Sequence, residues 1–338
     1  MKIERIGEFE LIERLARSLN KPGKNVIVGI GDDAAVIDIG TPDYMLFTTD
    51  MLVENIHFSR SYASGYQIGW RSMAANISDI AAMGGIPGVA AVSFGAAGDA
   101  EVEWVEDLYQ GMQELAAKYG VDIIGGDTVS SPQIIINIAL TGRVSISNLS
   151  LRSHAQLGDL ILTTGDFGGS AAGLEVLQEN KSEIRIPQSE IDYVVSRHLT
   201  PEPRIDASQI IAKHPQCHAL TDSSDGLACD LRNIGMASGV GAKVYADKIP
   251  IHPATKKVAE LANKRPIDFA LQGGEDFELV FTMPPDAALD VKQEVEEKLK
   301  LPISIIGDIV DKDQGIVILL PDGTAETLTK FGYNHFIK

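Results

Sequence analysis

The residues of this chain whose type and spacing could do chemistry are aspartates. Six of them stand where a strand or a helix is predicted to end, mostly beside Gly, Ser or Thr: Asp33, Asp50, Asp79, Asp127, Asp222 and Asp225. Carboxylate oxygens are hard ligands that suit Mg²⁺, which bridges protein carboxylates to substrate phosphates, and small neighbours leave room for a hydrated ion. Each aspartate alone is more typical of a turn or a cap. The six together, in a chain without a phosphate-binding lysine motif, favour a divalent-cation site.

Asp79 gives a separate indication of a cation. Apolar spacing predicts a helix over Tyr66–Met83, which Gly84, Gly85 and Pro87 end. Asp79 therefore lies in the last turns of this helix, where the helix dipole disfavours an anion by about 0.3–1 kcal/mol. A nearby cation would remove this penalty, so the position of Asp79 supports the same kind of site.

The first glycine-rich loop imitates a nucleotide-binding motif. Gly29-Ile-Gly-Asp-Asp-Ala34 fits the G-x-G-x-x-A pattern of dinucleotide-binding folds. That motif needs a helix directly after the glycines, whereas Ala35–Ile39 alternates like a strand, and two aspartates would face the pyrophosphate. We therefore reject this interpretation. The chain also has no G-x-x-x-x-G-K-[ST] and no protein-kinase catalytic loop, which leaves metal-assisted phosphoryl transfer open.

The charge of the chain excludes several classes of partner. Among 338 residues, 29 Lys and Arg oppose 47 Asp and Glu, a formal net charge of −18. Residues 25–117 hold thirteen acids and only Arg60 and Arg71 as bases, which gives 2 − 13 = −11. Such a surface repels nucleic acids and anionic membranes, so we expect neither as a partner. A solvated acidic face is the simpler interpretation for acids outside the six aspartates.

Cysteines and hydropathy suggest a cytoplasmic protein. Cys217 and Cys229 are too few for a disulfide framework. The first ten residues are too charged for a signal peptide, and no apolar run is long enough to span a membrane.

The order of predicted elements indicates α+β or α/β layering in two domains, 1–147 and 148–338. The boundary is predicted near residues 146–158, where Ile146–Leu151 is rich in Ser and Asn. The N-terminal domain should hold a mixed sheet with helices, and the C-terminal domain should be α/β. Helices are predicted at Glu8–Leu19, Tyr66–Met83, Ala100–Tyr119, Ser170–Glu179 and Asp206–Lys213. Strands are predicted at Val26–Ile30, Ala35–Ile39, Tyr44–Thr49, Val89–Phe94, Val121–Ile124, Gln133–Thr141, Asp159–Thr163, Ala270–Phe281 and Ile303–Val310.

A series of motifs in this order resembles the thiamine-monophosphate kinases. The series runs from about residue 7 to the C-terminus, and only its single motifs are shared with the wider aminoimidazole-ribonucleotide-synthetase-like superfamily. The motifs are Gly29-Ile-Gly-Asp-Asp-Ala-Ala35, Thr48-Thr-Asp50, His57-Phe58, Asn76-Ile-Ser-Asp-Ile-Ala-Ala-Met-Gly84, Gly125-Gly-Asp-Thr128, Ser224-Asp-Gly-Leu227, Gly273-Gly-Glu-Asp-Phe-Glu-Leu279 and Gly332-Tyr-Asn-His-Phe336.

The resemblance implies an N-terminal domain that forms a homodimer through its sheet and a C-terminal domain that completes the site. It also implies transfer of the ATP γ-phosphoryl group to thiamine monophosphate. Several Mg²⁺ ions would be held by Asp33, Thr48, Thr49, Asp50, Asp79, Asp127, Asp222 and Asp225. ATP would be held by Gly126, Asp127, Arg152 and Ser224, with Tyr109 as a further nucleotide contact, and the thiamine substrate would meet His57, Glu275 and Phe331.

The substrate residues have simpler alternatives. His57 could be a surface histidine, Phe331 could belong to the core, and Glu275 could merely end a turn. An aromatic ring at 331 does suit a cationic thiazolium, because ring faces attract quaternary nitrogen. Arg152, at the start of the second domain, suits a phosphate clamp.

The chemistry expected here is direct in-line transfer without a phosphoenzyme. The acceptor is an ionised phosphate, so no dedicated general base is needed, and Asp50, Asp127 and Asp225 should be the most critical residues. Two alternatives stay open at this point. One is another ATP-using enzyme of the superfamily, such as selenophosphate synthetase or aminoimidazole-ribonucleotide synthetase. The other is a non-enzymatic, acidic protein that binds divalent cations.

Overall fold

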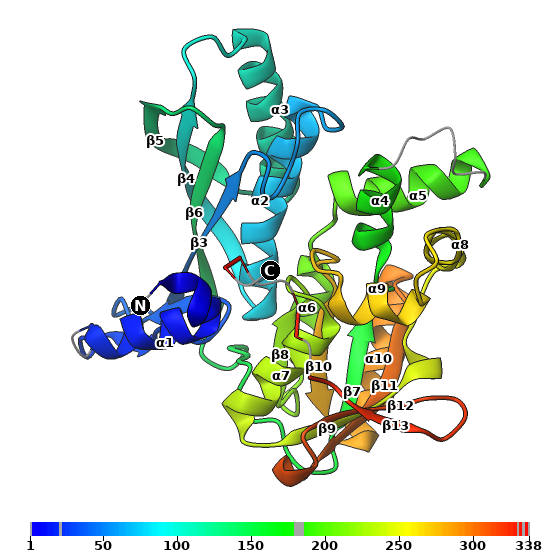
Figure 1. The fold of residues 1–338 in the computed structure, drawn as a ribbon. Coiled ribbons are helices and arrows are strands. Elements are labelled where there is room, and N and C mark those ends of the chain that lie inside the picture. The colour runs from blue at the N-terminus through cyan, green and yellow to red at the C-terminus, as the bar shows by residue number, and fades with distance from the viewer. Residues whose placement is uncertain (1, 20–21, 179–185, 330, 333–334, 337–338) are drawn as a thin grey trace.

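The computed structural model of the chain describes residues 2–19, 22–178, 186–329, 331–332 and 335–336. Two sheets, each with its own helices, lie side by side, as Figure 1 shows. Within the described residues, no helix is long and apolar enough to cross a membrane.

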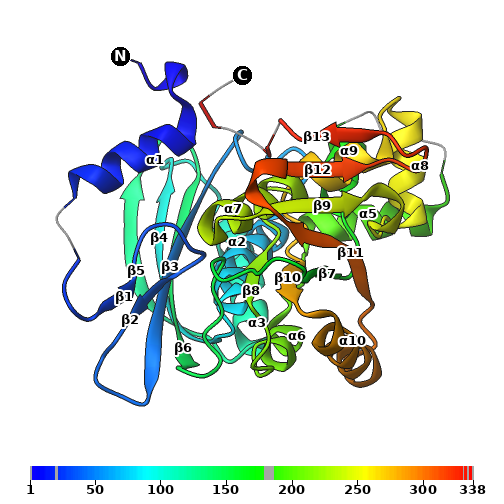
Figure 2. The ribbon, with the colours of Figure 1, turned by 90° about the horizontal axis from the view of Figure 1, so that it is seen from below.

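Six strands form the N-terminal sheet in the spatial order β1-β2-β3-β6-β4-β5. Neighbours run antiparallel except β4 and β5, which are parallel, so the sheet is mixed as predicted. Helices α2 (Gly65–Ala82) and α3 (Val102–Lys118) lie along one face (Figure 2). The strands are β1 Val26–Val28, β2 Ala35–Ile37, β3 Asp43–Val53, β4 Ile86–Ala96, β5 Asp122–Ser130 and β6 Ile135–Ser145.

Helix α2 is fixed from both ends and along its length. The Ser64 hydroxyl accepts from the Gln67 backbone N–H at the N-terminus, and the Gln67 side-chain oxygen accepts from the Ser64 backbone N–H. Gly69 lets α3 approach closely, because a Cβ there would stand 1.9 Å from the Leu108 carbonyl oxygen. Ile77 and other apolar side chains of α2 are fully buried. The helix that carries Asp79 is therefore a rigid support.

Seven strands form the C-terminal sheet in the order β13-β12-β9-β11-β7-β10-β8, all antiparallel except the pair β9 and β12. They are β7 Leu160–Thr164, β8 Ala219–Asp222, β9 Gly241–Tyr245, β10 Leu279–Met283, β11 Ile303–Val310, β12 Ile316–Leu319 and β13 Ala325–Thr327. The helices of this half are α4 Gly169–Gln178, α5 Gln188–Leu199, α6 Ile205–Ile211, α7 Leu227–Ser238, α8 Pro253–Leu261, α9 Pro266–Gln272 and α10 Pro285–Leu299, and α1 (Gly7–Ser18) precedes the first sheet.

Helix α2 also joins the two halves. Besides the N-terminal sheet, it packs against β8, α5 and α6 of the C-terminal half. The Trp70 indole donates to the Pro201 carbonyl at 2.8 Å, and the Ser208 hydroxyl donates to the Ala81 carbonyl. The last turn of α2, where Asp79 lies, therefore sits at the junction of the halves.

Most predicted elements are confirmed to within a few residues, including α1, α2, α3 and the strand β2 that excluded a dinucleotide motif. One prediction is wrong in part. Residues 270–281 are not a single strand, because α9 begins at Pro266, the chain leaves it at Gly273-Gly274, and β10 starts only at Leu279. The apolar run at 270–271 belongs to the buried face of a short helix, whose burial resembles that of a strand. Two other strands are longer than expected, since β3 continues past Asp50 and β5 runs through Gly125–Thr128.

Candidate active site

Three aspartates that are far apart in sequence meet at the junction of the two halves. Asp33 comes from the loop between β1 and β2, Asp79 from the last turn of α2, and Asp222 from the end of β8. One carboxylate oxygen of each lies within 4.8 Å of the others. We call these three residues the acidic cluster. Both halves of the molecule contribute to it.

The acidic cluster carries more negative charge than its protein neighbours neutralise. Burial, followed by the surrounding carboxylates, raises the pKa values of Asp79 and Asp222 well above the ordinary range. Thr48 donates a hydrogen bond to Asp79, and Ser78 donates one to Asp222. Within the described residues, Asp33 Oδ2 and Asp222 Oδ1 are buried without any partner. Orphaned carboxylate oxygens of this kind fit a hard cation such as Mg²⁺.

Two further aspartates lie in the field of this cluster. Burial, then the charges of Asp225 and Glu275, raises the pKa of Asp50 from 3.8 to about 6. Burial also raises the pKa of Asp225, with a further contribution from Glu8 of α1. Asp50 points to the side of the sheet that α2 covers, because it pairs in register with the buried Ile138. Five of the six predicted acids therefore gather in one region.

Arg152 supplies a positive charge next to the cluster. Its guanidinium forms an ion pair with Asp33 and donates to the Thr221 hydroxyl at 3.2 Å. Its backbone N–H donates to Asp32 at 3.2 Å, and burial followed by the Asp33 charge raises the pKa of Asp32 to about 7. Arg152 thus ties the start of the C-terminal half to the loop that carries Asp33.

Two loops cross closely beside Asp225. The Glu275 backbone N–H donates to the Ser224 carbonyl at 2.8 Å. A Cβ at Gly274 would stand 2.3 Å from that same carbonyl oxygen, which explains a glycine at this position. Glu275 itself has φ +65°, in the left-handed region that non-glycine residues rarely occupy. The crossing brings Ser224 and Glu275 together, and strained backbone of this kind is frequent at functional sites.

His57 lies near Glu275. Its Nδ1 accepts a hydrogen bond from the Val53 backbone N–H at 2.9 Å, so Nε2 carries the proton of the neutral ring. The ring centroid is 5.0 Å from that of His335. Burial, then His335, lowers the pKa of His57, while Glu275 raises it. The ring is thus held by its backbone contact with Nε2–H available to a ligand.

The sequence and fold comparisons agree on the family. Models for AIR synthase related proteins match residues 31–144 (N-terminal domain) and 156–319 (C-terminal domain). Thiamine-monophosphate kinase of Bacillus subtilis is 39% identical over 336 residues, covering 98% of this chain and 100% of the relative. The Escherichia coli enzyme of that name is 34% identical, with 98% of each chain covered. The chain belongs to the thiamine-monophosphate kinase family.

Solved structures extend this result. The structure named "AaThiL complexed with AMPPCP and TMP" superposes with a TM-score of 0.84, at 32% identity and with 99% of each chain covered. The Aquifex aeolicus thiamine monophosphate kinase gives 0.79 at 30% identity, covering 97% of this chain and 100% of that one. The Escherichia coli hydrogenase maturation protein HypE, at 21% identity, covering 94% of this chain and 96% of that one, and a TM-score of 0.70, shares the fold.

In this member of the kinase family, Thr49 and Asp127 lie away from the acidic cluster. Strand register places both on the open face of the sheet, opposite α2, because Asp127 pairs with the exposed Ser93 and Thr49 pairs with Ala139. Thr49 accepts a hydrogen bond from Asn137 at 2.9 Å. Thr48 and Asp50, in contrast, face α2. The predicted metal ligands on β3 and β5 thus divide between the two faces of the N-terminal sheet.

Gly126, Tyr109 and Phe331 lie outside the acidic cluster too. Gly126 is on β5, where a Cβ would stand 1.7 Å from the Val92 carbonyl oxygen. Tyr109, on α3, packs edge-on against Phe94, at 6.5 Å between ring centroids. The Phe331 ring packs against the core of the C-terminal half and has the Arg232 guanidinium 5.2 Å away.

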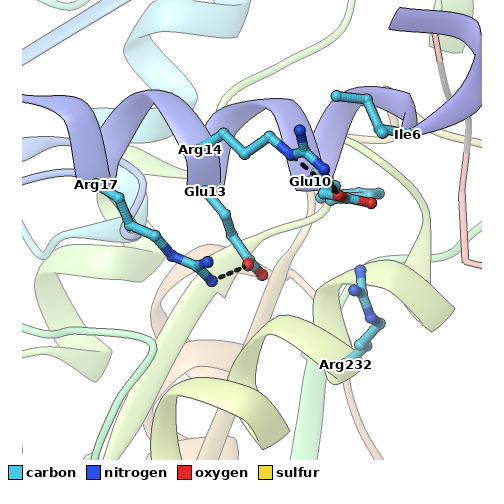
Figure 3. Close-up of a pocket in the computed structure, with 7 residues that line it drawn as sticks. Ile6, Glu10, Glu13, Arg14, Arg17 and Arg232 are labelled. Carbon is cyan, nitrogen blue, oxygen red and sulfur yellow. Dashed lines mark hydrogen bonds and ion pairs between the residues drawn. The ribbon is translucent and has the colours of Figure 1, made fainter. Parts of the chain in front are cut away.

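A hollow of about 670 Å³ lies between α1 and α7 (Figure 3). The Arg232 guanidinium stands at its edge, over the rings of Phe9 (4.7 Å) and Phe331 (5.2 Å). The other charged side chains, on α1, pair with one another along the helix. Its lining residues are Ile6, Phe9, Glu10, Glu13, Arg14, Arg17 and Arg232. The hollow is therefore distinct from the acidic cluster, and Arg232, one of its lining residues, also lies over the Phe331 ring.

The sequence analysis missed Arg71 and His198. Arg71 is buried on α2 and forms an ion pair with Glu275, and its Nη1 lies 3.2 Å from His198 Nε2. A signal for Arg71 was present, because it is one of only two basic residues between 25 and 117. His198 carried no signal, since a single histidine in an amphipathic helix is unremarkable before its partners are known.

Proposed function

We propose that this chain transfers the γ-phosphoryl group of ATP to the phosphate of thiamine monophosphate, giving thiamine diphosphate and ADP. The observation that supports this most strongly is the acidic cluster, whose orphaned carboxylate oxygens lie at the junction of two domains in a member of the thiamine-monophosphate kinase family. A relative solved with AMPPCP and TMP is similar over nearly the whole chain.

In this proposal the carboxylates of the cluster, with Asp50 and Asp225, hold several Mg²⁺ ions. Bound Mg²⁺ supplies the positive charge that lets two phosphate anions approach each other. Thr48 and Ser78 orient Asp79 and Asp222 by hydrogen bonding. The acceptor oxygen is already ionised, so the chain needs to position the groups rather than remove a proton. Thr49 and Asp127 would hold a further Mg²⁺ ion on the open face of the sheet, because strand register turns them away from the acidic cluster.

The substrates would occupy the surroundings of this site. Arg152 and Ser224, with Gly126 and Asp127, would hold ATP, and Tyr109 would be a more distant nucleotide contact. His57 and Glu275 would meet thiamine monophosphate, and Phe331 would offer a ring face to the thiazolium. The support is the close crossing of the 224 and 275 loops next to His57.

We also propose a cytoplasmic homodimer that forms through the open face of the N-terminal sheet. This face carries large apolar side chains that are unusually exposed for a sheet: Phe47 at 40%, Met51 at 53% and Val129 at 56%. A second copy would bury them. Light scattering on the purified protein should give twice the chain mass, and Met51→Glu should shift it toward the monomer.

The proposed activity is tested by incubating the protein with Mg-ATP and thiamine monophosphate and separating the products. We expect thiamine diphosphate and ADP in equal amounts, and loss of both when EDTA is added. Asp222→Asn should abolish the product, whereas Asp99→Asn, an exposed acid between β4 and α3, should not. Binding of Mg²⁺ without product under any divalent cation would contradict the proposal and favour a cation-binding protein.

A further inference from the structure

A chain of four polar side chains crosses from one domain to the other beside the acidic cluster. It begins at Ser170 of α4 and passes through His198 of α5, whose Nδ1 lies 3.0 Å from the Ser170 hydroxyl. His198 Nε2 lies 3.2 Å from Arg71 of α2, and Arg71 pairs with Glu275. The four residues come from three helices and one loop, so packing fixes all of them.

Arg71 is the centre of this chain. Its side chain is only 4% exposed, and a buried guanidinium is tolerated only when it is paired. A guanidinium can only donate, so His198 Nε2 must accept, which places the ring proton on Nδ1 facing Ser170. Burial, then the Arg71 charge, holds the pKa of His198 well below its usual value, in keeping with a neutral ring. Ser170 and His198 together therefore fix the direction of the Arg71 guanidinium.

Arg71 in turn fixes Glu275. The backbone of Glu275 is held at φ +65° by its hydrogen bond to Ser224, and Arg71 engages carboxylate oxygen Oε2. In the described part of the chain, no hydrogen bond is made to the other oxygen, Oε1. The charge of Glu275 reaches the site, because it raises the pKa values of both Asp50 and His57. A free glutamate side chain would lose rotamer freedom on meeting a ligand, whereas this one is already ordered.

We infer that Arg71 is a positioning residue for the thiamine substrate: it holds the Glu275 carboxylate and leaves Oε1 to meet that molecule, whose amino group can donate to it and whose thiazolium charge attracts it. This inference rests on the proposed function, from which the role of Glu275 comes. Within the described residues, no hydrogen bond or ion pair joins Arg71 to Arg152 or Asp33. The Glu275 contact to Ser224, on the nucleotide side, is made by the backbone N–H and not by the carboxylate that Arg71 holds. The loss of Arg71 should therefore affect one substrate and not the other.

The test measures steady-state kinetics for Arg71→Met, Arg71→Lys, Glu275→Gln and the double variant Arg71→Met/Glu275→Gln. We expect Arg71→Met to raise the KM for thiamine monophosphate by about tenfold or more, the loss of one charge-assisted hydrogen bond. The KM for ATP and kcat should change by less than about threefold. Arg71→Lys keeps a charge for Glu275 but loses the planar fork, so its effect should be smaller. The double variant should be no worse than Glu275→Gln alone.

A surface pair gives the matched control. Arg265→Met removes an arginine that pairs with Asp268 on the exposed side of α9, and it should leave both KM values unchanged. Additive effects of Arg71→Met and Glu275→Gln would overturn the inference, as would equal rises in both KM values accompanied by a fall in melting temperature. If Arg71→Met does not fold, Arg71→Lys must still separate the two KM values. A wild-type protein that makes no thiamine diphosphate would contradict the proposed function instead.

Discussion

Replacing Asp50 by Asn should stabilise the protein when divalent cations are removed. Burial is the main reason why the pKa of Asp50 rises from 3.8 to about 6, and the charges of Asp225 and Glu275 add to it. Keeping Asp50 ionised in the folded state therefore costs free energy, about 3 kcal/mol for this rise. Within the described residues, the Asp50 carboxylate accepts no hydrogen bond that Asn would break. The substitution should recover most of that cost.

The sign of the pH dependence follows from the raised pKa. Below pH 3.8 Asp50 is protonated in both the folded and the unfolded state. The variant and the wild type should then have the same free energy of unfolding. As the pH rises to about 6, the unfolded state ionises first, and the wild type loses stability. The advantage of Asp50→Asn should be about half its full size at pH 5 and complete at pH 8.

Urea unfolding in EDTA at pH 5 and pH 8 measures this difference. Asp99→Asn, an exposed acid, serves as the control and should stay within about 0.5 kcal/mol of wild type. With Mg²⁺ at about 100 times its dissociation constant, wild type should gain about 2.7 kcal/mol, and Asp50→Asn should gain less. An Asp50→Asn protein that is less stable than wild type at pH 8 in EDTA would refute the reasoning. So would a difference that does not shrink at pH 5.

Three further outcomes are expected. Gly126→Ala should destabilise the protein by more than about 1 kcal/mol in urea unfolding, because its Cβ would stand 1.7 Å from the Val92 carbonyl oxygen at a φ of +156°. Arg204→Met should cost about 1.5–3 kcal/mol in the same measurement, since Glu278, whose side chain is 0% exposed, would lose a partner at 2.7 Å and keep Arg197 at 3.0 Å. Asp127→Asn should lower kcat by about tenfold or more with an unchanged melting temperature; near-normal turnover at saturating Mg²⁺ would remove it from the metal set.

Much of the fold and part of the site could be predicted because the signals were local. The long helix α2 follows from apolar spacing, and its C-terminal end follows from the Gly-Gly stop. The position of Asp79 in its last turn then follows directly. Residues 270–271 were misjudged as strand because a short buried helix and a buried strand look alike in composition, and only the turn at Gly273 separates them.

Other features of the site depend on contacts that no local pattern contains. Asp127 stands beside a small residue, as most of the other five acids do, yet strand register turns it to the open face of the sheet, and register is set by pairing with β4. Arg71 and His198 are 127 residues apart and meet only because α2 packs against α5. The resemblance to the family indicates only which residues belong to the ligand set. The structure adds which of these residues face the same side of the N-terminal sheet, and that Arg152 pairs with one of them, Asp33.

The negative charge of the acidic cluster opposes the contact between the two domains. The cluster exists only because that contact is made. At the effective dielectric of a protein, two like charges about 5 Å apart repel by about 3 kcal/mol, and Asp222 faces Asp33 and Asp79 across the junction. The packing of α2 against β8, α5 and α6 opposes this repulsion, since each apolar side chain that is fully buried there contributes about 1.5–3 kcal/mol. Packing thus closes the junction, and the pKa values of Asp79 and Asp222 are raised first by this burial and then by the neighbouring carboxylates. A cation held there converts that repulsion into attraction between the domains, so catalytic ions and domain contact should stabilise each other.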